Sequence, residues 1–472
     1  MHSCNCSKPS AEPQPAAAAP RRAEYVFVAA GLILLAAVAL RPSIRGNDGV
    51  GHYVYLASLL RGGDLDLADD YRAFDRLKHY PYRFRDLPRS PCTGLYGNRF
   101  GVGAALLWAP FVFTLRILPW GQPADPAMTG LTRPYEWAVG VGTAAYVFAA
   151  LLLLYRRLRR RQGPFAGALT VCALLLATPL GFYALAHGSM SHGVEFFAAV
   201  LSLLAFEAAW TRPSARRAAL LGATAGLLAM IRIQDGAWGL VFAAAVCLRA
   251  WRVPAAAGSD GRITKGAGIP RLLKHGLSFA AAALLAFTPQ LAVWKILYGS
   301  WLSGPVPYLD GSVAYFSPWP RHALEALFSE RGGVLAWHPV MALGLVGLCS
   351  ALMRPTQDRP AAAVGLAGFA AQVVVVGSWS AWWAGASFGN RYFIAALPFL
   401  AIGLSRWLEN ATPSGRRRRA LLVVLLIFWN LGLLVQYATQ MVPREDAVAW
   451  SRVVRQNLTD VPRWLWHRIF PG

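Results

Sequence analysis

The chain has 472 residues, 56% of them hydrophobic, and a mean hydropathy of +0.39. This composition excludes an ordinary soluble domain, because many apolar runs approach the roughly 20 residues that a membrane-spanning helix needs. A net charge of +23 is typical of nucleic-acid-binding proteins. Here the basic residues are divided among short loops between apolar runs, so membrane topology explains them better. The six cysteines form neither a disulfide framework nor a metal-ligand spacing.

The N-terminal residues 1–23 are rich in Ala, Pro and Ser, and we predict a disordered cytoplasmic tail. An apolar run from Tyr25 to Leu40 follows Arg21 and Arg22. The run has features of a cleaved signal peptide, including Ala37-Val38-Ala39. We favour an uncleaved first span, because a long membrane-embedded chain follows it. The two arginines place the N-terminus in the cytoplasm.

A long polar segment, residues 41–100, follows this span and is predicted to be an external loop. It contains seven aspartates and ten Lys or Arg residues. The positive charge opposes the positive-inside rule, which is weaker for loops of this length. The stretch from Gly46 to Leu60 places one carboxylate, Asp48, in a turn before an amphipathic helical pattern. We predict that this helix lies in the membrane interface and presents Asp48 at its start.

The next segment, Gly101 to Leu118, is apolar but short, and Pro110 interrupts it. If it spanned the membrane, the arginine cluster at 156–161 would lie outside, so we predict an interfacial or re-entrant segment. With this choice the strongest basic clusters all become cytoplasmic. The remaining predicted spans are 136–155, 165–185, 193–210, 218–231, 237–248, 276–294, 333–353, 361–376, 393–404 and 420–436.

These segments predict an all-α, polytopic transmembrane helical bundle of about eleven spans within residues 24–437. Residues 295–331 form a second external loop, and residues 438–472 form an external tail. The expected location is the inner (plasma) membrane of a bacterium, with the N-terminus in the cytoplasm. The unusual polar side chains then gather on the external face: Asp48, His187, His192, Arg232, Asp235 and Arg391.

Asp48 has two compatible interpretations. As a helix N-cap its carboxylate would accept hydrogen bonds from free backbone N–H groups. As a general base it would accept a proton from a substrate. The other aspartates of the loop, at 64, 66, 69 and 70, are of the type that holds a divalent cation, but their spacing matches no calcium loop and a solvated loop is favoured.

Other polar and aromatic residues also have two interpretations. His187 and His192 do not have the i, i+4 spacing of a helical zinc site, so they are interfacial residues or form hydrogen bonds with a phosphate. Arginines at the external ends of apolar segments either extend their charge into the interface or bind a phosphate with two parallel hydrogen bonds. They are Arg99, Arg232 and Arg391. The tryptophans at 379, 382 and 383 form an interfacial belt or stack on a sugar, and the belt is favoured.

In their order along the chain, these motifs resemble those of the GT-C superfamily of polytopic glycosyltransferases. The resemblance is greatest to the branch related to protein O-mannosyltransferases and the lipid A aminoarabinose transferase. In that branch an external loop opens with Asp-Glu, continues with a Tyr and reaches Gly-Asp at the end of an interfacial helix. The matching residues are Asp48, Tyr53, Gly63-Asp64, Asn98-Arg99-Phe100, Ser189-Met190-Ser191-His192, Trp337-His338-Pro339, and Trp382-Trp383 to Gly389-Asn390-Arg391-Tyr392. Gly49 stands where better-known members have the second acid.

The resemblance implies transfer of a sugar from a polyprenyl-phosphate donor to an acceptor hydroxyl on the external face, with inversion at the anomeric carbon. Asp48 alone would be the general base. The donor phosphate would be bound by Arg391, Arg232, Arg99 and His192. The expected substrate contacts are His52, Tyr53, Asp64, Trp382 and Trp383. No metal or other cofactor is predicted, and the expected partners are the lipid-linked donor, a lipid, glycan or protein acceptor, and membrane lipid, but no nucleic acid.

Two other functions are compatible with a chain that has many membrane spans. A transporter or lipid flippase should carry ionisable residues near the membrane midplane or show an internal repeat, and the spans show neither clearly. An oligosaccharide polymerase or ligase usually has its large external loop late in the chain, whereas here the largest is the first.

Overall fold

The computed structural model describes residue 31 and residues 44–77, 89–252, 268–302 and 316–470. These ranges are helical and contain no β-strand, only two isolated bridges, Arg89 with Tyr96 and Phe316 with Trp379. The predicted all-α transmembrane bundle is therefore confirmed. The predicted N-terminal tail and, except for residue 31, the first predicted span lie outside the described residues.

The helices follow one another through short connections, and most boundaries have a local cause. Proline occupies the first turn of α5, α6, α14, α15, α16 and α17, where its missing N–H has no partner to lose. The described α-helices are α2 (Gly46–Arg61), α3 (Ala68–Arg76), α4 (Gly103–Ile117), α5 (Arg133–Gln162), α6 (Pro164–Leu176), α7 (Leu180–Leu185), α8 (His192–Thr211), α9 (Ala215–Ile231), α10 (Gly236–Arg252), α11 (Gly268–Tyr298), α12 (Ala323–Phe328), α13 (Val334–Trp337), α14 (Pro339–Met353), α15 (Arg359–Gly377), α16 (Leu397–Glu409), α17 (Pro413–Ala438), α18 (Trp450–Arg455) and α19 (Val461–Ile469). Shorter turns are η2 (Pro119–Gly121), η3 (Pro126–Met128), η4 (Ile233–Asp235), η6 (Arg391–Ala396) and η7 (Gln456–Asp460).

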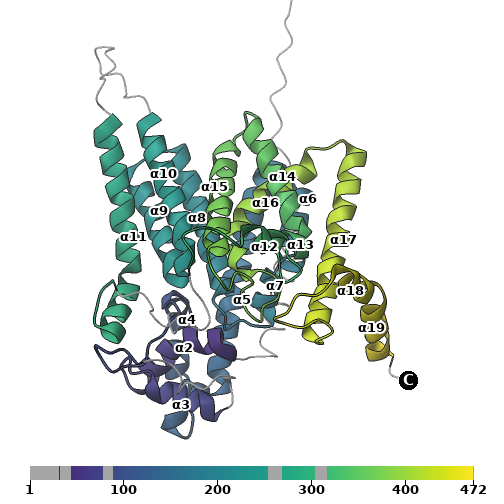
Figure 1. Ribbon diagram of the computed structural model, residues 1–472. Helices are drawn as coiled ribbons and strands as arrows, with labels where there is room; N and C mark the ends of the chain where they lie inside the picture. The colour runs from purple at the N-terminus through teal and green to yellow at the C-terminus, as the bar shows by residue number, and fades with distance from the viewer. Residues whose placement is uncertain (1–30, 32–43, 78–88, 253–267, 303–315, 471–472) are drawn as a thin grey trace, which may run out of the picture.

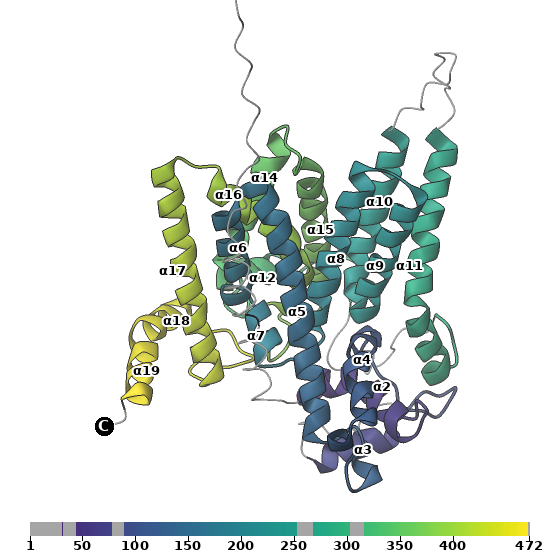
Figure 2. The same ribbon diagram turned by 180° about the vertical axis from the view of Figure 1, so that it is seen from behind.

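The long helices stand side by side, and the N-terminal loop closes one end of the bundle (Figure 1). At this end, called the Asp48 end below, α2 and α3 lie across the ends of the long helices, with α4 beside α2 (Figures 1 and 2). The connections α5–α6, α8–α9, α14–α15 and α16–α17 lie at the opposite end, called the basic end below. The predicted topology also places these four connections on one side of the membrane, opposite the loop that contains Asp48. That the Asp48 end faces outside stays a prediction.

Seven of the described helical segments are long and apolar enough to cross a membrane: Pro126–Gln162, His192–Thr211, Ile233–Arg252, Gly268–Tyr298, Arg359–Gly377, Arg391–Glu409 and Pro413–Ala438. Three shorter apolar helices are α4, α6 and α14. The chain is thus an integral membrane protein, but the predicted count of eleven spans is not confirmed. Two predicted spans are broken by proline: residues 165–185 divide into α6 and α7 before Leu180, and residues 333–353 divide into α13 and α14 at Pro339.

Small residues let the long helices approach one another closely. At the crossing of α14 and α16, a Cβ built on Gly347 would lie 1.9 Å from the carbonyl oxygen of Gly403. At the crossing of α9 and α11, a Cβ on Gly222 would lie 2.1 Å from the carbonyl oxygen of Phe279. Such close backbone contact is how helices associate in lipid, where burial of apolar side chains gives little driving force. One crossing includes α16, which follows Arg391, and the other includes α9, which precedes Arg232.

The basic end is closed by an ionic network around Asp358. Its carboxylate accepts hydrogen bonds from Arg157 Nη2 at 2.5 Å, Gln162 Nε2 at 2.6 Å and Arg406 Nη1 at 3.1 Å, and Glu207 binds Arg157 at 2.6 Å. The network joins α5, α8 and α16 to the start of α15. Because each buried charge has a partner, the network fixes these helix ends without leaving an uncompensated ion.

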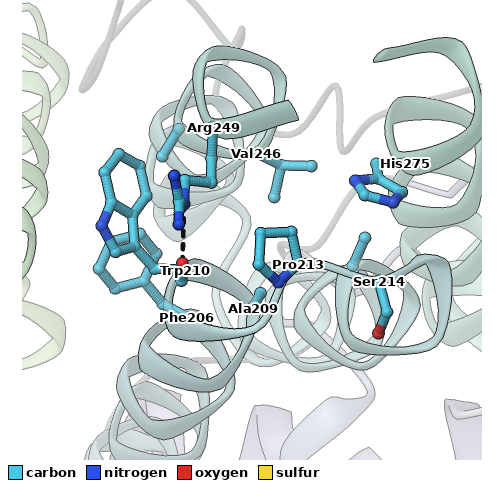
Figure 3. Close-up of a pocket in the computed structure, with 10 residues that line it drawn as sticks. Phe206, Ala209, Trp210, Pro213, Ser214, Val246, Arg249 and His275 are labelled. Carbon is cyan, nitrogen blue, oxygen red and sulfur yellow. Dashed lines mark hydrogen bonds between the residues drawn. The ribbon is translucent and has the colours of Figure 1, made fainter. Parts of the chain in front are cut away.

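A pocket between α8, α9, α10 and α11 also lies at the basic end (Figure 3). Arg249 reaches across its wall and donates from Nε to the carbonyl oxygen of Trp210 at 2.8 Å, a carbonyl at the end of α8. The arginine thus satisfies one of the acceptors that every helix C-terminus leaves free. This pocket is at the opposite end of α8 from His192, so it is separate from the polar cluster that the sequence predicted.

Candidate active site at the Asp48 end

Asp48 lies in the first turn of α2, but it is not the N-cap. The helix begins at Gly46, which has φ +73°, and the N-cap position is Arg45, which makes no side-chain capping bond. The N-cap interpretation of Asp48 is therefore wrong. The predicted helix itself is confirmed, yet it is buried on nearly every side from Gly49 to Ser58, so it is enclosed by its neighbours and does not lie flat on a surface.

The Asp48 carboxylate forms an ion pair with Arg391. Asp48 Oδ2 lies 2.8 Å from Arg391 Nη1, and the side chains are 16% and 11% exposed. Arg391 opens η6 two residues after Gly389, which has φ +63° and lies against His338. The Asn390 side chain accepts a hydrogen bond from Tyr392 N and so shapes this turn. The Arg391 Nε donor has no partner among the described residues. Two residues far apart in the sequence thus meet at the end of the bundle at which both were expected, although their pairing was not predicted.

A second group of charges lies behind this pair. Arg232 Nη1 donates to Ser191 Oγ at 3.1 Å and lies 3.4 Å from His192 Nε2. The two predicted phosphate ligands, Arg232 and His192, are therefore neighbours. The positive charges of Arg232 and, more weakly, of Arg99 also act on the Asp48 carboxylate and lower its pKa.

Glu195 joins this second group, and the sequence analysis missed it. Its Oε2 lies 2.8 Å from His192 Nδ1 and 3.5 Å from Arg232 Nε, while its Oε1 accepts a hydrogen bond from Ala395 N at 3.1 Å. Glu195 is fully buried. The signal in the sequence was an acid three residues after His192 at the start of an apolar span, where an unpaired carboxylate would be costly.

Asp235 and Gln372 extend the group toward α15. Asp235 Oδ1 accepts a hydrogen bond from Gln372 Nε2 at 3.1 Å, and Gln372 Oε1 accepts one from Trp238 Nε1 at 3.2 Å. Gln372 also donates to the carbonyl oxygen of Tyr392, the residue after Arg391. Gln372 was not predicted, because a glutamine inside an apolar run gives no indication of which neighbour it will meet. It connects the Asp235 carboxylate to the backbone beside Arg391.

His52 lies one turn after Asp48 on α2. Its Nδ1 donates to the carbonyl oxygen of Gly101 at 3.1 Å, and its Nε2 is buried without a partner among the described residues. Burial, and then the charge of Arg232, lower the pKa of His52 to about 4. The ring is therefore neutral near pH 7, and with Nδ1 carrying the hydrogen, Nε2 is a hydrogen-bond acceptor beside the Asp48–Arg391 pair.

The pKa of Asp48 is the balance of two opposed effects. Burial raises the pKa, but the positive charges of Arg391 and then of Arg232 lower it by more than burial raises it, so that the pKa lies below the ordinary value. Asp48 is consequently ionised at neutral pH. A carboxylate in this state attracts cations strongly but is a weak proton acceptor.

Four predicted site residues have other contacts. The Tyr53 hydroxyl donates to the carbonyl oxygen of Gly130 at 2.8 Å. Asp64 accepts hydrogen bonds from Asp66 N and Ser58 Oγ beyond the far end of α2, about 20 Å along the helix from Asp48. Trp382 is buried, and the Trp383 ring lies 3.8 Å from the Arg331 guanidinium carbon. These contacts stabilise loops, so a substrate role for the four residues stays a prediction.

A close contact explains why glycine stands at position 49 in this fold. A Cβ built on it would lie 2.5 Å from Ser189 Oγ, which comes from the turn before α8. Ser189 is itself buried. The second acid expected from the resemblance therefore cannot stand here unless Ser189 moves. Asp48 is the carboxylate that α2 contributes to this cluster.

No protein-family model matches the chain, and no curated protein matches it. Among solved structures, the chain is similar to ArnT from Cupriavidus metallidurans. The ArnT structure bound to undecaprenyl phosphate has 15% sequence identity and a TM-score of 0.50, over 95% of this chain and 78% of ArnT. The apo structure gives 15% identity and a TM-score of 0.51, over 94% and 76%. The chain has the GT-C fold.

The predicted resemblance is thus confirmed for the fold. A further similar structure is the archaeal oligosaccharyltransferase AglB from Archaeoglobus fulgidus, with 16% identity and a TM-score of 0.46 over 94% of this chain and 59% of AglB.

Removing the Glu195 carboxylate should destabilise the protein. The variant Glu195→Ala leaves Arg232, His192 and Ala395 N without this buried acceptor, and we expect a loss of about 3–5 kcal/mol in the free energy of unfolding, as for other broken buried ion pairs. Glu195→Gln keeps an acceptor and should lose less. The matched control is Glu325→Ala, which removes a half-exposed carboxylate. Unfolding in detergent measures all three, and equal losses for Glu195→Ala and Glu325→Ala would contradict the assigned role.

The contact of Gly49 with Ser189 predicts a non-additive pair of substitutions. Gly49→Ala alone should destabilise the protein, because the new methyl group meets Ser189 Oγ. Adding Ser189→Gly should restore part of the loss, with a coupling energy of about 0.5–3 kcal/mol. Gly239→Ala, whose Cβ would lie 3.9 Å from its nearest neighbour, is the control. Additive effects in the unfolding measurement would show that the two residues do not meet.

Proposed function

We propose that the protein is a membrane glycosyltransferase that moves a sugar, a hexosyl or pentosyl group, from a polyprenyl-phosphate donor to an acceptor hydroxyl at the Asp48 end. The observation that carries the proposal is the buried Asp48–Arg391 ion pair with Arg232 and His192 behind it. One carboxylate for proton transfer and several cationic groups for a phosphate stand together at one end of a membrane bundle. Similarity to ArnT, solved with undecaprenyl phosphate, supports a lipid-linked donor.

The reaction needs two kinds of group, and this cluster contains both. A base must take the proton of the acceptor hydroxyl as the oxygen attacks the anomeric carbon, and Asp48 is assigned that role. The sugar–phosphate bond breaks on the opposite side, which inverts the configuration. The departing phosphate gains negative charge, which Arg391 and Arg232 offset without proton transfer.

The resting ion pair suggests how the base is activated. A donor phosphate attracts Arg391 as strongly as a carboxylate does, and the guanidinium has an unpartnered Nε with which to bind it. When the phosphate takes up part of the charge of Arg391, burial becomes the dominant influence on Asp48 and its pKa rises. Asp48 then becomes a better proton acceptor when the donor is in place. His52 Nε2 is positioned to accept a hydrogen bond from a substrate hydroxyl.

The alternative of a transporter or flippase gains no support from the arrangement of charges. Glu195 lies in the first turn of α8, and Asp235 directly precedes α10. Both belong to the Asp48 end, whereas a transport site is expected near the midplane. The ionic network around Asp358 is at the basic end. The buried charges described here therefore do not form a path across the bundle.

Replacing the proposed base should strongly slow sugar transfer. We expect Asp48→Asn to lower the rate of sugar transfer by about 10²–10⁴-fold, the usual contribution of a general base. Transfer from a radiolabelled polyprenyl-phosphate sugar in membrane preparations measures this rate. Asp69→Asn, which changes an exposed carboxylate of α3, is the control and should stay within about twofold of the unaltered protein. Full activity of Asp48→Asn would falsify the assignment.

Donor binding should also move the acidic limb of the pH profile. Because the pKa of Asp48 is lowered, its base form is present above that pKa and is lost as the pH falls through it. The profile of kcat/KM for the donor reports the free enzyme, and that of kcat reports the substrate complex. We expect the limb of kcat to lie at higher pH, since the donor phosphate weakens the hold of Arg391 on Asp48.

Two variants test the origin of that limb. Arg391→Gln should raise the pKa of Asp48 in the free enzyme and shift the kcat/KM limb upward, because burial is then less fully offset. His52→Gln removes the other group that titrates near pH 4 and should leave the difference between the two limbs unchanged. Identical limbs in kcat and kcat/KM would show that the donor does not release Asp48.

A further inference from the structure

The C-terminal helical segment, residues 450–469, lies outside the bundle beside α17 (Figures 1 and 2). It consists of α18, the π-helical turn η7 and α19, and it is at the Asp48 end of α17. The function proposed above makes no use of it.

Polar side chains attach the first half of this segment to α17. Gln436 Nε2 donates to the carbonyl oxygen of Val453 at 3.1 Å and to Asn457 Oδ1 at 2.7 Å. Asn457 Nδ2 donates to the carbonyl oxygen of Trp429 at 3.0 Å. Gln436 is fully buried. Since α17 is one of the helices that can cross a membrane, these bonds fix η7 at a definite height beside a spanning helix.

The second half, α19, has very little protein around it. Val461 is buried, but every residue from Pro462 to Phe470 is exposed, including Trp466 at 63% and Ile469 at 65%. α19 continues the helical backbone of α18 and η7, so it extends outward from the attached half of the segment. Its large apolar side chains are left without cover by the described residues, and exposed apolar side chains grouped in this way indicate a partner surface.

The composition of α19 identifies that surface. Leu465 and Ile469, four residues apart, lie on one side of the helix, and Arg463 and His467, also four apart, lie on the other, with Trp466 at the border between them. A helix with large apolar side chains on one side, basic side chains on the other and tryptophan at the border is typical of a segment in a lipid headgroup layer. The neighbouring α17 also exposes large apolar side chains, as expected of a lipid-facing helix: Leu421, Leu422, Leu425 and Phe428. Arg455, Arg463 and Arg468 give the segment a positive charge that matches anionic lipids.

We propose that α19 is an interfacial anchor for the lipid leaflet at the Asp48 end. Leu465, Trp466 and Ile469 enter the boundary between headgroups and acyl chains, and Arg463 and Arg468 contact the phosphates of anionic lipids. The anchor does not depend on the proposed transferase activity.

Spin labels can test which medium surrounds each side of α19. Single cysteines are placed at 463, 466, 467 and 469 in full-length protein from which the native cysteines have been removed, and each carries a nitroxide in vesicles of phosphatidylcholine and phosphatidylglycerol. We expect positions 466 and 469 to be relaxed by oxygen, which concentrates in lipid. Positions 463 and 467 should be relaxed by a water-soluble nickel complex. Leu421→Cys on α17 and Asp446→Cys in the loop before α18 are the lipid and water references.

The same labels define the results that overturn the proposal. Relaxation of positions 466 and 469 by the nickel complex would show that α19 lies in water. Shielding of both positions from both reagents would show that a second copy or another protein covers the helix. If the two arginines hold α19 on anionic lipid, the double substitution Arg463→Gln and Arg468→Gln should increase access of the nickel complex to position 466. Equal access with and without the two arginines would show that anionic lipid has no part in holding α19.

Discussion

The arrangement of the Asp48 end depends on placing a carboxylate and a guanidinium against each other at the edge of a membrane bundle. In such surroundings an unpaired charge is costly, whereas a pair with further hydrogen-bond donors is tolerated. Asp48 and Arg391 satisfy this requirement for α2 and η6. Glu195 and Arg232 satisfy it one layer further in, and Glu195 also binds the backbone of η6 at Ala395. The two layers therefore connect the N-terminal loop, α8 and the region of α16.

The same constraint explains how two arginines are held close together at the Asp48 end. Arg391 has a carboxylate to neutralise it at rest, and Arg232 has Glu195. Because both guanidiniums are held by acids that come from other helices, their positions are set before any ligand arrives, which is the condition for electrostatic preorganisation. The neutral His52 adds an acceptor without adding another charge to balance.

The sequence predicted the helical bundle because the length of apolar runs and the charge of loops are local properties, and they largely determine how a chain inserts into a membrane. It also predicted that Asp48, His192, Arg232 and Arg391 would gather at one end, since topology alone decides the end. It could not predict which acid pairs with which arginine. Glu195 and Gln372 were missed because each is a single polar residue within an apolar run, and its importance depends on a partner in a distant helix. The predicted count of spans is not confirmed. At Pro179 and Pro339, prolines divide apolar runs that are continuous in composition, and composition alone does not show these breaks.

The separation of Asp48 and Arg391 along the chain has a consequence for biosynthesis. Asp48 is synthesised before Arg391, and the described helices α3 to α15 are made in between. During that interval the Asp48 carboxylate lacks the partner that makes its burial favourable, so we expect α2 to stay at the water boundary until η6 has been made. The site is completed only when η6 is in place, and a chain truncated before residue 391 should form the earlier spans without a closed Asp48 end.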